Sequence, residues 1–468
     1  MINNKITFAL YYGNRGFFPG SLFVGARKEL KEAVKNAGFE YLEMDESLTR
    51  YGAVETIQEG KKYSDFLKDN YDKIDGVIVC LPNFGDENGA YHALKNFNKP
   101  ILMQAYPDEF GKLGHDHRRD SVCGKLAMCN VFRQSGIKYT LTKNFACHPL
   151  SEDFKEDLIQ FAGICRGYNG LKSINIGAIG ARTTAFKTVR IDEIAMQKKR
   201  VNIETIDLSL VFDMMDKVSK DKVESTKEYY KNKYDFSKYK DEPIENMARL
   251  NVVLEELIKK YDLSALSLRC WDEIELKYHF APCVVVAEFN ERGIPISCEL
   301  DVDNALMMKA LTLVSDSPVI LLDANNNFKD DLSKCILFHC GPAPLSFIEG
   351  KAKVDDHLTF KKSYGDFASC GVHVGKLITG DVTIGSIKTE DGSICSFALE
   401  GEFTKDEIDS NFFGVGAVFK GTYTKANDMF NFMALNGYRH HVTVCKGHYL
   451  KAIKELFENY LEYNFKAL

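Results

Sequence analysis

Apolar runs with the length of a β-strand alternate with longer amphipathic stretches through the first 170 residues. The amphipathic stretches 21–38 and 63–71 space their apolar positions as a helix does. The strand-like runs are KITFALYY (5–12), DGVIVCLP (75–82) and KPILMQAYP (99–107). Strands that alternate with helices favour βαβ units on a parallel sheet. We therefore predict an α/β domain over residues 1–170.

The same alternation resumes near Leu171 and continues to about residue 343. A charged stretch with helical spacing, Met215 to Lys260, separates the strand-like runs. These runs are 173–182, 201–209, 263–271, 283–289 and 318–324. The pattern predicts a second α/β domain over residues 171–343.

From residue 344 onward the apolar runs become shorter and are separated by turn residues. The segments 377–403 and 413–423 show this most clearly, and an amphipathic helix is expected over 449–465. Such spacing is typical of a compact antiparallel barrel or sandwich. The predicted fold is therefore two Rossmann-like parallel α/β domains followed by a C-terminal antiparallel β-rich, barrel-like domain over 344–468.

Composition narrows the class of protein further. The chain has 468 residues, 45% hydrophobic and 27% charged, with a net charge of −6 and interleaved acidic and basic residues. This balance gives no electrostatic footprint for nucleic acid or an anionic membrane. No apolar run approaches the roughly 20 residues of a membrane span, and the first residues lack a signal-peptide pattern. We expect a cytoplasmic protein with a small-molecule partner.

Thirteen cysteines occur, and most of them lie inside apolar stretches. Buried, reduced thiols are expected from this placement rather than a disulfide framework. Cys335 and Cys340 flank His339 and so raise the alternative of a zinc site. The absence of any CxxC pair in the chain speaks against that alternative.

Acidic and histidine side chains follow the apolar runs at scattered positions. Glu299 lies in the segment Cys298-Glu299-Leu300-Asp301, Asp323 ends PVILLD, and His339 and the pair His440-His441 come later. Carboxylates and imidazoles at strand ends are suitable ligands for a divalent cation. Ordinary strand-end acids that cap helices or face solvent are the alternative. The pair His440-His441 precedes a β-branched run, so strand alternation predicts that only one of the two joins a given site.

Several polar loops are candidates for substrate binding, although plain loops, surface ion pairs and a core tryptophan remain alternatives. They follow predicted strands or gather charge in a short segment. The candidate residues are Asn14, Arg15, Asn83, Asp86, His115, His117, Arg118, Arg119, Arg182 and Trp271.

The motif GAIGAR, Gly177 to Arg182, follows a predicted strand. A helical pattern comes after the motif, and this is the geometry of a helix N-terminus that binds an anion. Asp207 at the end of the next strand keeps a nucleotide site open, although the full GxGxxG pattern is absent. A tight turn that requires small residues is the alternative.

Taken together, the segment Ile-Pro-x-x-Cys-Glu-x-Asp, an acid 24 positions after the glutamate and the late His-His pair resemble the L-fucose and L-arabinose isomerase family. The segments GNRGFFPG, PNFGDENGA and RRDSVCGKL are similar to its L-fucose isomerase-like branch. The resemblance implies the metal-binding acid pair Glu299 and Asp323, His441 or His440 as the late histidine ligand, and His339 as a fourth ligand. It also implies Mn²⁺ as cofactor and a homo-oligomer, a trimer or hexamer, whose active site lies near a subunit interface.

The chemistry of the residues agrees with this resemblance. Proton transfer between C1 and C2 of an open-chain sugar passes through an enediolate, which a cation stabilises while Glu299 and Asp323 carry the proton. We expect an aldose–ketose isomerase for an unphosphorylated fucose-like, arabinose-like, deoxy- or sulfo-sugar such as sulfoquinovose. A sulfonate is considered because guanidinium groups match oxyanion geometry. A non-catalytic sugar-binding module and a nicotinamide-dependent sugar oxidoreductase are the alternatives.

Overall fold

The computed structural model describes residues 5–351, 353–409 and 413–468, and their contacts divide the chain into two compact units. The N-terminal unit comprises the described residues up to Asn169 together with Glu455–Glu462. The C-terminal unit comprises Gly170–Lys454 and Tyr463–Leu468. The predicted division of the C-terminal unit at residue 343 stays a prediction.

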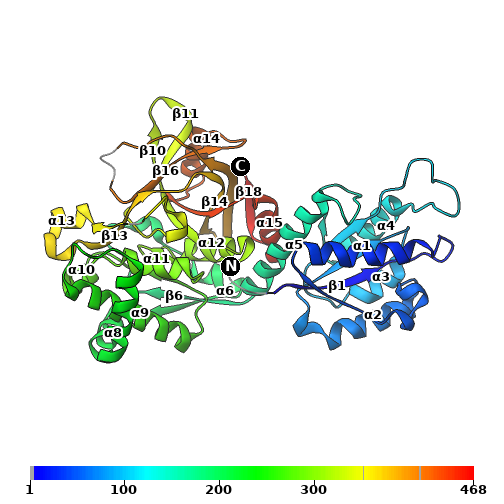
Figure 1. The fold of residues 1–468 in the computed structure, drawn as a ribbon, viewed down its shortest axis with the longest axis horizontal. Coiled ribbons are helices and arrows are strands. Elements are labelled where there is room, and N and C mark those ends of the chain that lie inside the picture. The colour runs from blue at the N-terminus through cyan, green and yellow to red at the C-terminus, as the bar shows by residue number, and fades with distance from the viewer. Residues whose placement is uncertain (1–4, 352, 410–412) are drawn as a thin grey trace. The chain divides into compact units, whose positions relative to one another are not determined.

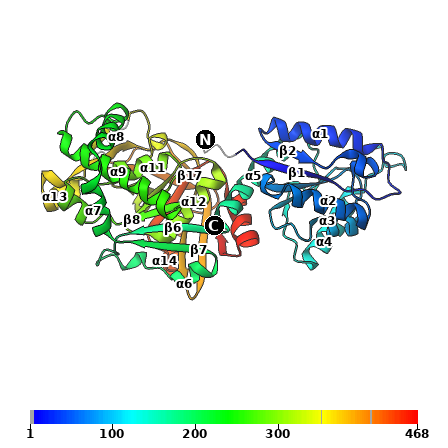
Figure 2. The same ribbon diagram turned by 90° about the horizontal axis from the view of Figure 1, so that it is seen from below.

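The N-terminal unit is a parallel sheet in the order β2-β1-β3-β4-β5 with helices on both faces (Figures 1 and 2). Its strands are β1 (Thr7–Tyr12), β2 (Glu40–Glu43), β3 (Gly76–Leu81), β4 (Ile101–Ala105) and β5 (Thr140–Leu141). Its helices are α1 (Leu22–Asn36), α2 (Ile57–Asp69), α3 (Glu87–Leu94), α4 (Ser121–Gln134) and α5 (Glu152–Leu171). Every residue of β3 is buried, as a central strand covered on both faces requires. The predicted parallel α/β architecture is confirmed.

The C-terminal unit contains a second parallel sheet, in the order β7-β6-β8-β9. Its strands are β6 (Ile174–Ile179), β7 (Val201–Ile206), β8 (Ala265–Leu268) and β9 (Ile296–Cys298). The associated helices are α6 (Glu193–Lys198), α7 (Leu208–Lys217), α8 (Lys220–Lys233), α9 (Asp241–Tyr261), α10 (Glu273–Tyr278), α11 (Cys283–Glu291) and α12 (Val302–Ser315).

One run predicted as a strand of this sheet is a helix. The segment 283–289, CVVVAEF, forms most of α11, and nearly all of its residues are buried. A helix that is surrounded by protein is apolar on all sides, so its sequence shows neither helical nor strand periodicity. The strand prediction at 283–289 is therefore wrong.

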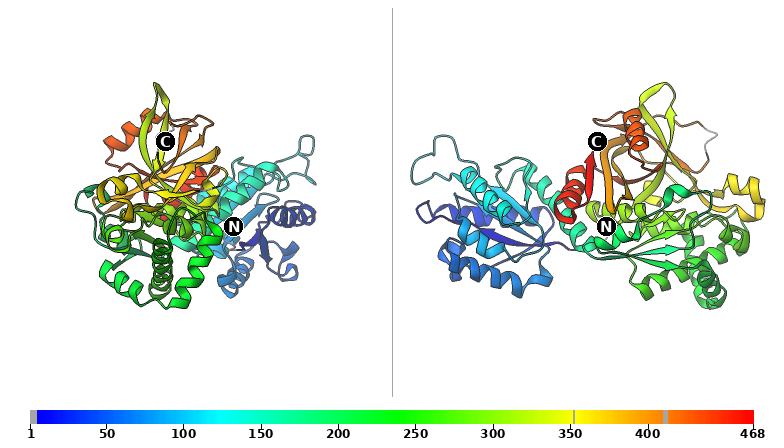
Figure 3. Two further views of the ribbon diagram at one scale, coloured as in Figure 1. Left: turned by 60° about the vertical axis from the view of Figure 1, so that its left-hand side comes forward. Right: turned by 180° about the vertical axis from the view of Figure 1, so that it is seen from behind.

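The second sheet of this unit closes into a barrel, as predicted (Figure 3). Neighbouring strands around the ring pair antiparallel in the spatial order β16-β11-β10-β17-β14-β15. The pairing of β15 with β16 closes the ring. The barrel strands are β10 (Val319–Phe328), β11 (Asp331–His339), β14 (Gly380–Glu390), β15 (Ser393–Phe403), β16 (Val415–Gly421) and β17 (His441–Lys446). The flanking elements are β12 (Lys353–Asp356), β13 (Cys370–Lys376), β18 (Asn464–Ala467), α13 (Leu358–Tyr364), α14 (Ala426–Leu435) and α15 (Leu450–Lys454).

Strand β10 corrects a second expectation. The sequence places PVILLDA in the parallel sheet with Asp323 at the strand end, but β10 is an antiparallel barrel strand and Asp323 lies at its middle. A fully apolar half-strand is typical of a buried parallel strand, and here the barrel interior and α12 cover β10 instead.

Side-chain alternation on the barrel wall decides which residues point to α12. Ile320 and Leu322 of β10 and Val442 and Val444 of β17 belong to the barrel core. Asp323 and His441, one residue out of phase, therefore lie on the opposite face. Helix α12 packs between the barrel and the parallel sheet (Figure 1), so this face meets the segment that follows β9.

The chain end differs slightly from the predicted helix over 449–465. Helix α15 continues into a π-helical segment at Glu455–Leu461, and β18 then pairs with β15. Among the described residues, every helix is too short or too polar to cross a bilayer.

Candidate metal centre

Three of the predicted ligands meet inside the C-terminal unit. Glu299 directly follows β9, Asp323 lies on β10, and His441 is the first residue of β17. In the antiparallel pairing of β10 with β17, Asp323 stands directly opposite His441. Glu299 and Leu300 both adopt a left-handed backbone, with φ of 59° and 61°, which turns the chain sharply between β9 and α12.

The ligand atoms of these three side chains are buried and close together. His441 Nε2 lies 3.1 Å from Glu299 Oε2 and 3.5 Å from Asp323 Oδ1. None of these three atoms is aligned for a hydrogen bond with any described residue. Ligands at about 2.1 Å from an octahedral cation and at right angles to each other are about 3 Å apart. The set therefore fits a small divalent cation, which would also compensate the buried carboxylates.

His339 and His440 complete two overlapping groups of potential ligands. Glu299, His440 and His441 form one group, and Asp323, His339 and His441 form the other, with the ligand atoms of each within 4.8 Å of one another. The expectation that only one of His440 and His441 can face the site is wrong. Strand β17 begins at His441, so strand alternation does not apply to His440.

The two buried histidines differ in what their Nδ1 atoms contact. The backbone N–H of Cys340 donates to His339 Nδ1 at 2.9 Å, so a neutral His339 ring carries its proton on Nε2. His441 Nδ1 instead lies 2.8 Å from Asp301 Oδ2, which can only accept while it is ionised. In these contacts His339 Nε2 is a donor, and His441 Nε2 is the atom free to bind a cation.

Burial and neighbouring charges shift the pKa of each group. Burial raises the pKa of Asp323 to about 7, with His441 opposing and Glu299 adding to the shift. Burial alone would raise the pKa of Glu299, but its close contact with His441 lowers the pKa overall. Burial also lowers the pKa of His339 to about 3 and that of His440 to about 4. The site thus combines one ionised carboxylate with one that titrates near neutrality.

His441 behaves in the opposite way to the other two histidines. Burial opposes its charge, yet the carboxylates of Asp301 and Glu299 raise its pKa to about 10. Without a cation His441 is therefore an imidazolium between two carboxylates. A cation that binds Nε2 has to displace a proton from it.

An ion-paired network behind His441 was missed by the sequence reasoning. It consists of Asp301, Asp303 and Arg439, which are all buried. A spacing of two residues could have suggested it, because Asp301 is two residues from Glu299 and Arg439 is two residues from His441.

Aromatic side chains line one side of the cluster. The Phe186 ring lies 5.5 Å from His440, 6.0 Å from His441 and 5.8 Å from Trp271, measured between ring centroids. Trp271 also contacts Phe360. The predicted residue Trp271 is therefore near the cluster and partly buried. Arg182, on the same loop as Phe186, donates to the carbonyl of Thr183 at 3.1 Å.

The GAIGAR motif is not followed by a helix N-terminus. After β6 ends at Ile179 the chain runs through a loop that contains one short 3-10 helix at Lys187–Val189, and α6 begins only at Glu193. Asp207 accepts a hydrogen bond from the backbone N–H of Ser209 and caps α7. The predicted helix that would bind an anion is therefore wrong, and the motif forms a turn with φ of 91° at Gly180.

In the N-terminal unit, the predicted polar residues bond mainly to one another. Asn83 Nδ2 donates to Asn14 Oδ1 at 2.8 Å, and Asn14 Nδ2 donates to Glu55 at 2.9 Å. Arg15 pairs with Glu87 and covers the ring of Phe84, and Asp86 caps α3 through Gly89 N–H. Each of these side chains has a structural partner within its own unit.

The second polar loop of that unit is more exposed. His115 and His117 face solvent, and Arg118 pairs with Asp120 at 2.6 Å. Arg119 is partly buried, donates to the carbonyl of Pro82 and lies over the ring of Tyr106.

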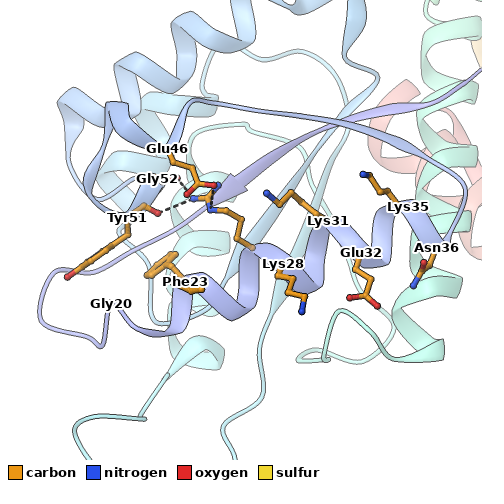
Figure 4. A pocket seen from close by; sticks show the side chains of 12 residues that line it. Gly20, Phe23, Lys28, Lys31, Glu32, Lys35, Asn36, Glu46, Tyr51 and Gly52 are labelled. Carbon is orange, nitrogen blue, oxygen red and sulfur yellow. Dashed lines mark hydrogen bonds and ion pairs between the residues drawn. The ribbon is translucent and has the colours of Figure 1, made fainter.

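A groove of about 670 Å³ runs along α1 of the N-terminal unit (Figure 4). Lys28, Lys31 and Lys35 line it, and Phe23 stacks on Tyr51 at one end. Arg27 is held beneath by Glu43 and by the carbonyls of Tyr51 and Gly52. None of the carboxylates and histidines of the candidate cation site belongs to this groove.

The cysteines agree with the expectation of reduced thiols. All 13 lie within the described residues and are free, and most of them are buried. Cys335 and Cys340 join no group of potential metal ligands among the described residues.

Two protein-family models match the chain. The model for the N-terminal domain of fucose/sulfoquinovose isomerase matches residues 9–172, and the model for the C-terminal domain of L-fucose isomerase matches residues 337–468. A sulfoquinovose isomerase of Priestia megaterium is 22% identical over 63% of this chain and 64% of the relative. Sulfoquinovose isomerases of Alkalicoccus urumqiensis and Clostridium sp. are 22% and 25% identical over 60% and 59% of this chain and 62% of each relative. The matched region thus spans just under two thirds of these relatives.

Proposed function

Because the chain belongs to the L-fucose isomerase-like family, we propose that it is an aldose–ketose isomerase that requires a divalent cation, with Mn²⁺ as the preferred metal. One observation carries the proposal. Buried ligand atoms of Glu299, Asp323 and His441 converge without hydrogen-bond partners among the described residues. Two carboxylates and an imidazole form a donor set that suits manganese.

In this proposal Glu299 and Asp323 share the proton transfer. Isomerisation removes a proton from C2 of an open-chain aldose and returns it to C1, while a hydroxyl proton moves from O2 to O1. A carboxylate beside the reacting carbons, such as Asp323, can take up and return the proton. A bound divalent cation supplies Lewis-acid stabilisation of the negative charge that develops on the substrate oxygens.

The other residues near the cluster have supporting roles in the proposal. His339 Nε2 donates a hydrogen bond to a substrate oxygen, since its Nδ1 is already engaged as an acceptor. Phe186 and Trp271 exclude water from the reacting carbons and offer an apolar face to the sugar ring.

We further propose a sulfo-sugar, sulfoquinovose or a close analogue, as the substrate, ahead of neutral fucose- or arabinose-like sugars. The three relatives compared above are sulfoquinovose isomerases. Arg182 is partly exposed on the Phe186 loop, and its guanidinium can bind a sulfonate with paired hydrogen bonds.

For the N-terminal unit we propose a role through assembly. A homo-oligomer, a trimer or hexamer, would bring the loop of His115, His117, Arg118 and Arg119 to a neighbouring subunit's substrate. Its exposure supports this role. Asn14, Arg15, Asn83 and Asp86 would shape the edge from which that loop projects.

The test is a sugar panel with controlled metal. Chelator-treated protein is incubated with sulfoquinovose, L-fucose and L-arabinose, with and without Mn²⁺, and ketose formation is followed by NMR. We expect turnover only with metal, and fastest with sulfoquinovose. Binding of a sugar without any turnover would favour a non-catalytic sugar-binding protein and contradict the proposal.

A further inference from the structure

Arg439 is held in one orientation immediately behind His441. Its side chain is only 4% exposed, one guanidinium nitrogen donates to Asp301 Oδ1, and the other donates to Asp303 Oδ2 at 2.7 Å. Its Nε donates to the carbonyl of Thr188 at 3.1 Å. A planar guanidinium bonded along both edges cannot rotate without breaking several charged hydrogen bonds at once.

Asp301 connects this anchor to the imidazole of His441. Its carboxylate accepts from Asn304 at two places, from the backbone N–H at 3.2 Å and from Nδ2 at 2.7 Å. Oδ2 lies 2.8 Å from His441 Nδ1. Because Asp301 is fully buried and its position is fixed by Arg439 and Asn304, the direction of the imidazole ring is fixed as well.

The consequence for His441 follows from the inventory of its ring atoms. An ionised carboxylate only accepts, so the Nδ1 proton stays between the ring and Asp301. The lone pair that can bind a cation is then confined to Nε2, which lies between Glu299 and Asp323. His339 is the internal contrast, because a backbone N–H donor at its Nδ1 places the proton on Nε2.

We infer that Asp301, anchored by Arg439, is a positioning residue that fixes the tautomer and orientation of His441 and so selects His441 Nε2 as the imidazole ligand of the cation site. The inference rests on the proposed function, since it concerns the same site. A purely structural role for Asp301, as the N-cap of α12, predicts a loss of stability with no change in metal affinity.

Titration of Mn²⁺ into metal-free protein, followed by calorimetry, separates the two roles. Asp301→Asn keeps the size of the side chain but removes the charge, and we expect the Mn²⁺ dissociation constant to rise about 10- to 100-fold. The matched control is Glu288→Gln, another fully buried carboxylate of the same unit, which bonds Lys233, Tyr229 and Tyr234. We expect the control to bind Mn²⁺ within about twofold of the wild type, as expected for a carboxylate that does not contact the ligands.

Thermal unfolding of the metal-free variants shows whether each of them folds. If Asp301→Asn fails to fold, Arg439→Lys decides, because lysine keeps the charge but loses the fork that holds Asp301. We expect Arg439→Lys to weaken Mn²⁺ binding by about three- to tenfold, at the lower end of such effects. Unchanged Mn²⁺ affinity in a folded Asp301→Asn protein, or in Arg439→Lys where that variant decides, overturns the inference.

Two further outcomes keep this inference distinct from the proposed function. Wild-type protein that binds no Mn²⁺ overturns the inference, and sugar turnover by the same sample then tests the proposed function separately. Should the Asp301 variant lose metal affinity while the wild type converts no sugar of the panel, the inference stands and the proposed function fails.

Discussion

Polar side chains follow strands of a parallel sheet in both units, after β1 and β3 in one and after β9 in the other, but their hydrogen bonding differs. In the N-terminal unit the strand order reverses direction between β1 and β3, the usual place for a ligand in an open α/β sheet. There Asn14 and Asn83 bond to each other, and Arg15 pairs with Glu87. In the C-terminal unit, buried atoms of Glu299, Asp323 and His441 face one another without hydrogen bonds among the described residues.

This contrast shows which observation distinguishes a site from a well-bonded loop. Polar residues follow a strand in both units, and amino-acid composition does not distinguish the two places. Buried polar atoms without partners cost free energy, and they occur in both units, for example at Tyr12 and Gln104 of the N-terminal unit. Among the described residues, those of Glu299, Asp323 and His441 also lie close together as potential ligands, and this convergence distinguishes the site.

The largest effect is expected when the two carboxylates of the candidate cation site are neutralised. We expect Glu299→Gln and Asp323→Asn each to lower kcat/KM by about 1,000-fold or more, because each removes a charged ligand and a proton carrier. Thermal unfolding of the metal-free proteins should change little for Asp323→Asn, whereas Glu299→Gln removes an ion-pair partner of His441 and should lower the melting temperature. Steady-state kinetics checks this, with the exposed helix cap Asp207→Asn as control. Wild-type turnover by both carboxylate variants would exclude this site.

Substitution of Asn83 in the N-terminal unit is expected to lower stability rather than turnover. Asn83→Ala leaves Asn14 Oδ1 and the N–H groups of Arg15 and Gly85 without their partner, at a cost of about 2 kcal/mol. Denaturant titration measures this, and the exposed Asn130→Ala should stay within about 0.5 kcal/mol of the wild type. A stable Asn83→Ala protein with greatly reduced turnover would show that this part of the N-terminal unit takes part in catalysis.

Asp356 of the C-terminal unit is a buried acid with ion-pair partners, so its effect on the pH dependence of stability can be compared with the raised pKa of Asp323. Burial opposes ionisation of Asp356, but Lys361, Tyr239 and Lys238 lower its pKa to about 2, whereas the pKa of Asp323 is raised. A lowered folded-state pKa gives stability that is present above about pH 4 and lost as pH falls toward 2. Because the lysines are half exposed, we expect only about 1 kcal/mol.

Unfolding of Asp356→Asn between pH 2 and 5 checks this prediction. The variant should lose the part of the acid dependence that Asp356 contributes. Asn130→Ala, an exposed substitution that adds or removes no titratable group, is the control and should retain the wild-type slope. An identical slope in all three proteins would assign the acid dependence to other groups.

The smallest effect is expected at the exposed loop of the N-terminal unit. His117→Ala should leave the free energy of unfolding within about 0.5 kcal/mol, because the side chain is exposed. If a neighbouring subunit uses the loop, turnover falls by about three- to tenfold, as for loss of one hydrogen bond. Sedimentation of the same sample establishes the assembly, and full activity of a monomer would contradict the oligomer proposal.

Sequence alone identified the fold and part of the site for definite physical reasons. The alternation of strands and helices predicted both parallel sheets, and the spacing of short strands predicted the barrel. Glu299 was placed correctly after a strand, since β9 ends at Cys298. Local periodicity and turn chemistry carry this information, and both depend on nearby residues only.

The errors arose where burial on all sides removes periodicity or where a long-range contact decides. The segment 283–289 forms a buried helix, and Asp323 lies within an antiparallel strand, because both are covered in ways that a local pattern does not encode. The contact of Asp301 with His441 spans 140 positions and depends on how the barrel meets α12. Pairing of such distant residues follows only from the assembled tertiary structure.

Glu299 and Leu300 share a left-handed backbone, but they differ in whether glycine can replace them during evolution. Each non-glycine residue in that conformation costs about 1–2 kcal/mol, which glycine would relieve. Leu300→Gly is thus an accessible step for a lineage that adapts to heat, limited only by the loss of a half-buried side chain. The same step at Glu299 would delete the carboxylate itself, so natural variation at these neighbours should diverge, with glycine tolerated at one and excluded from the other.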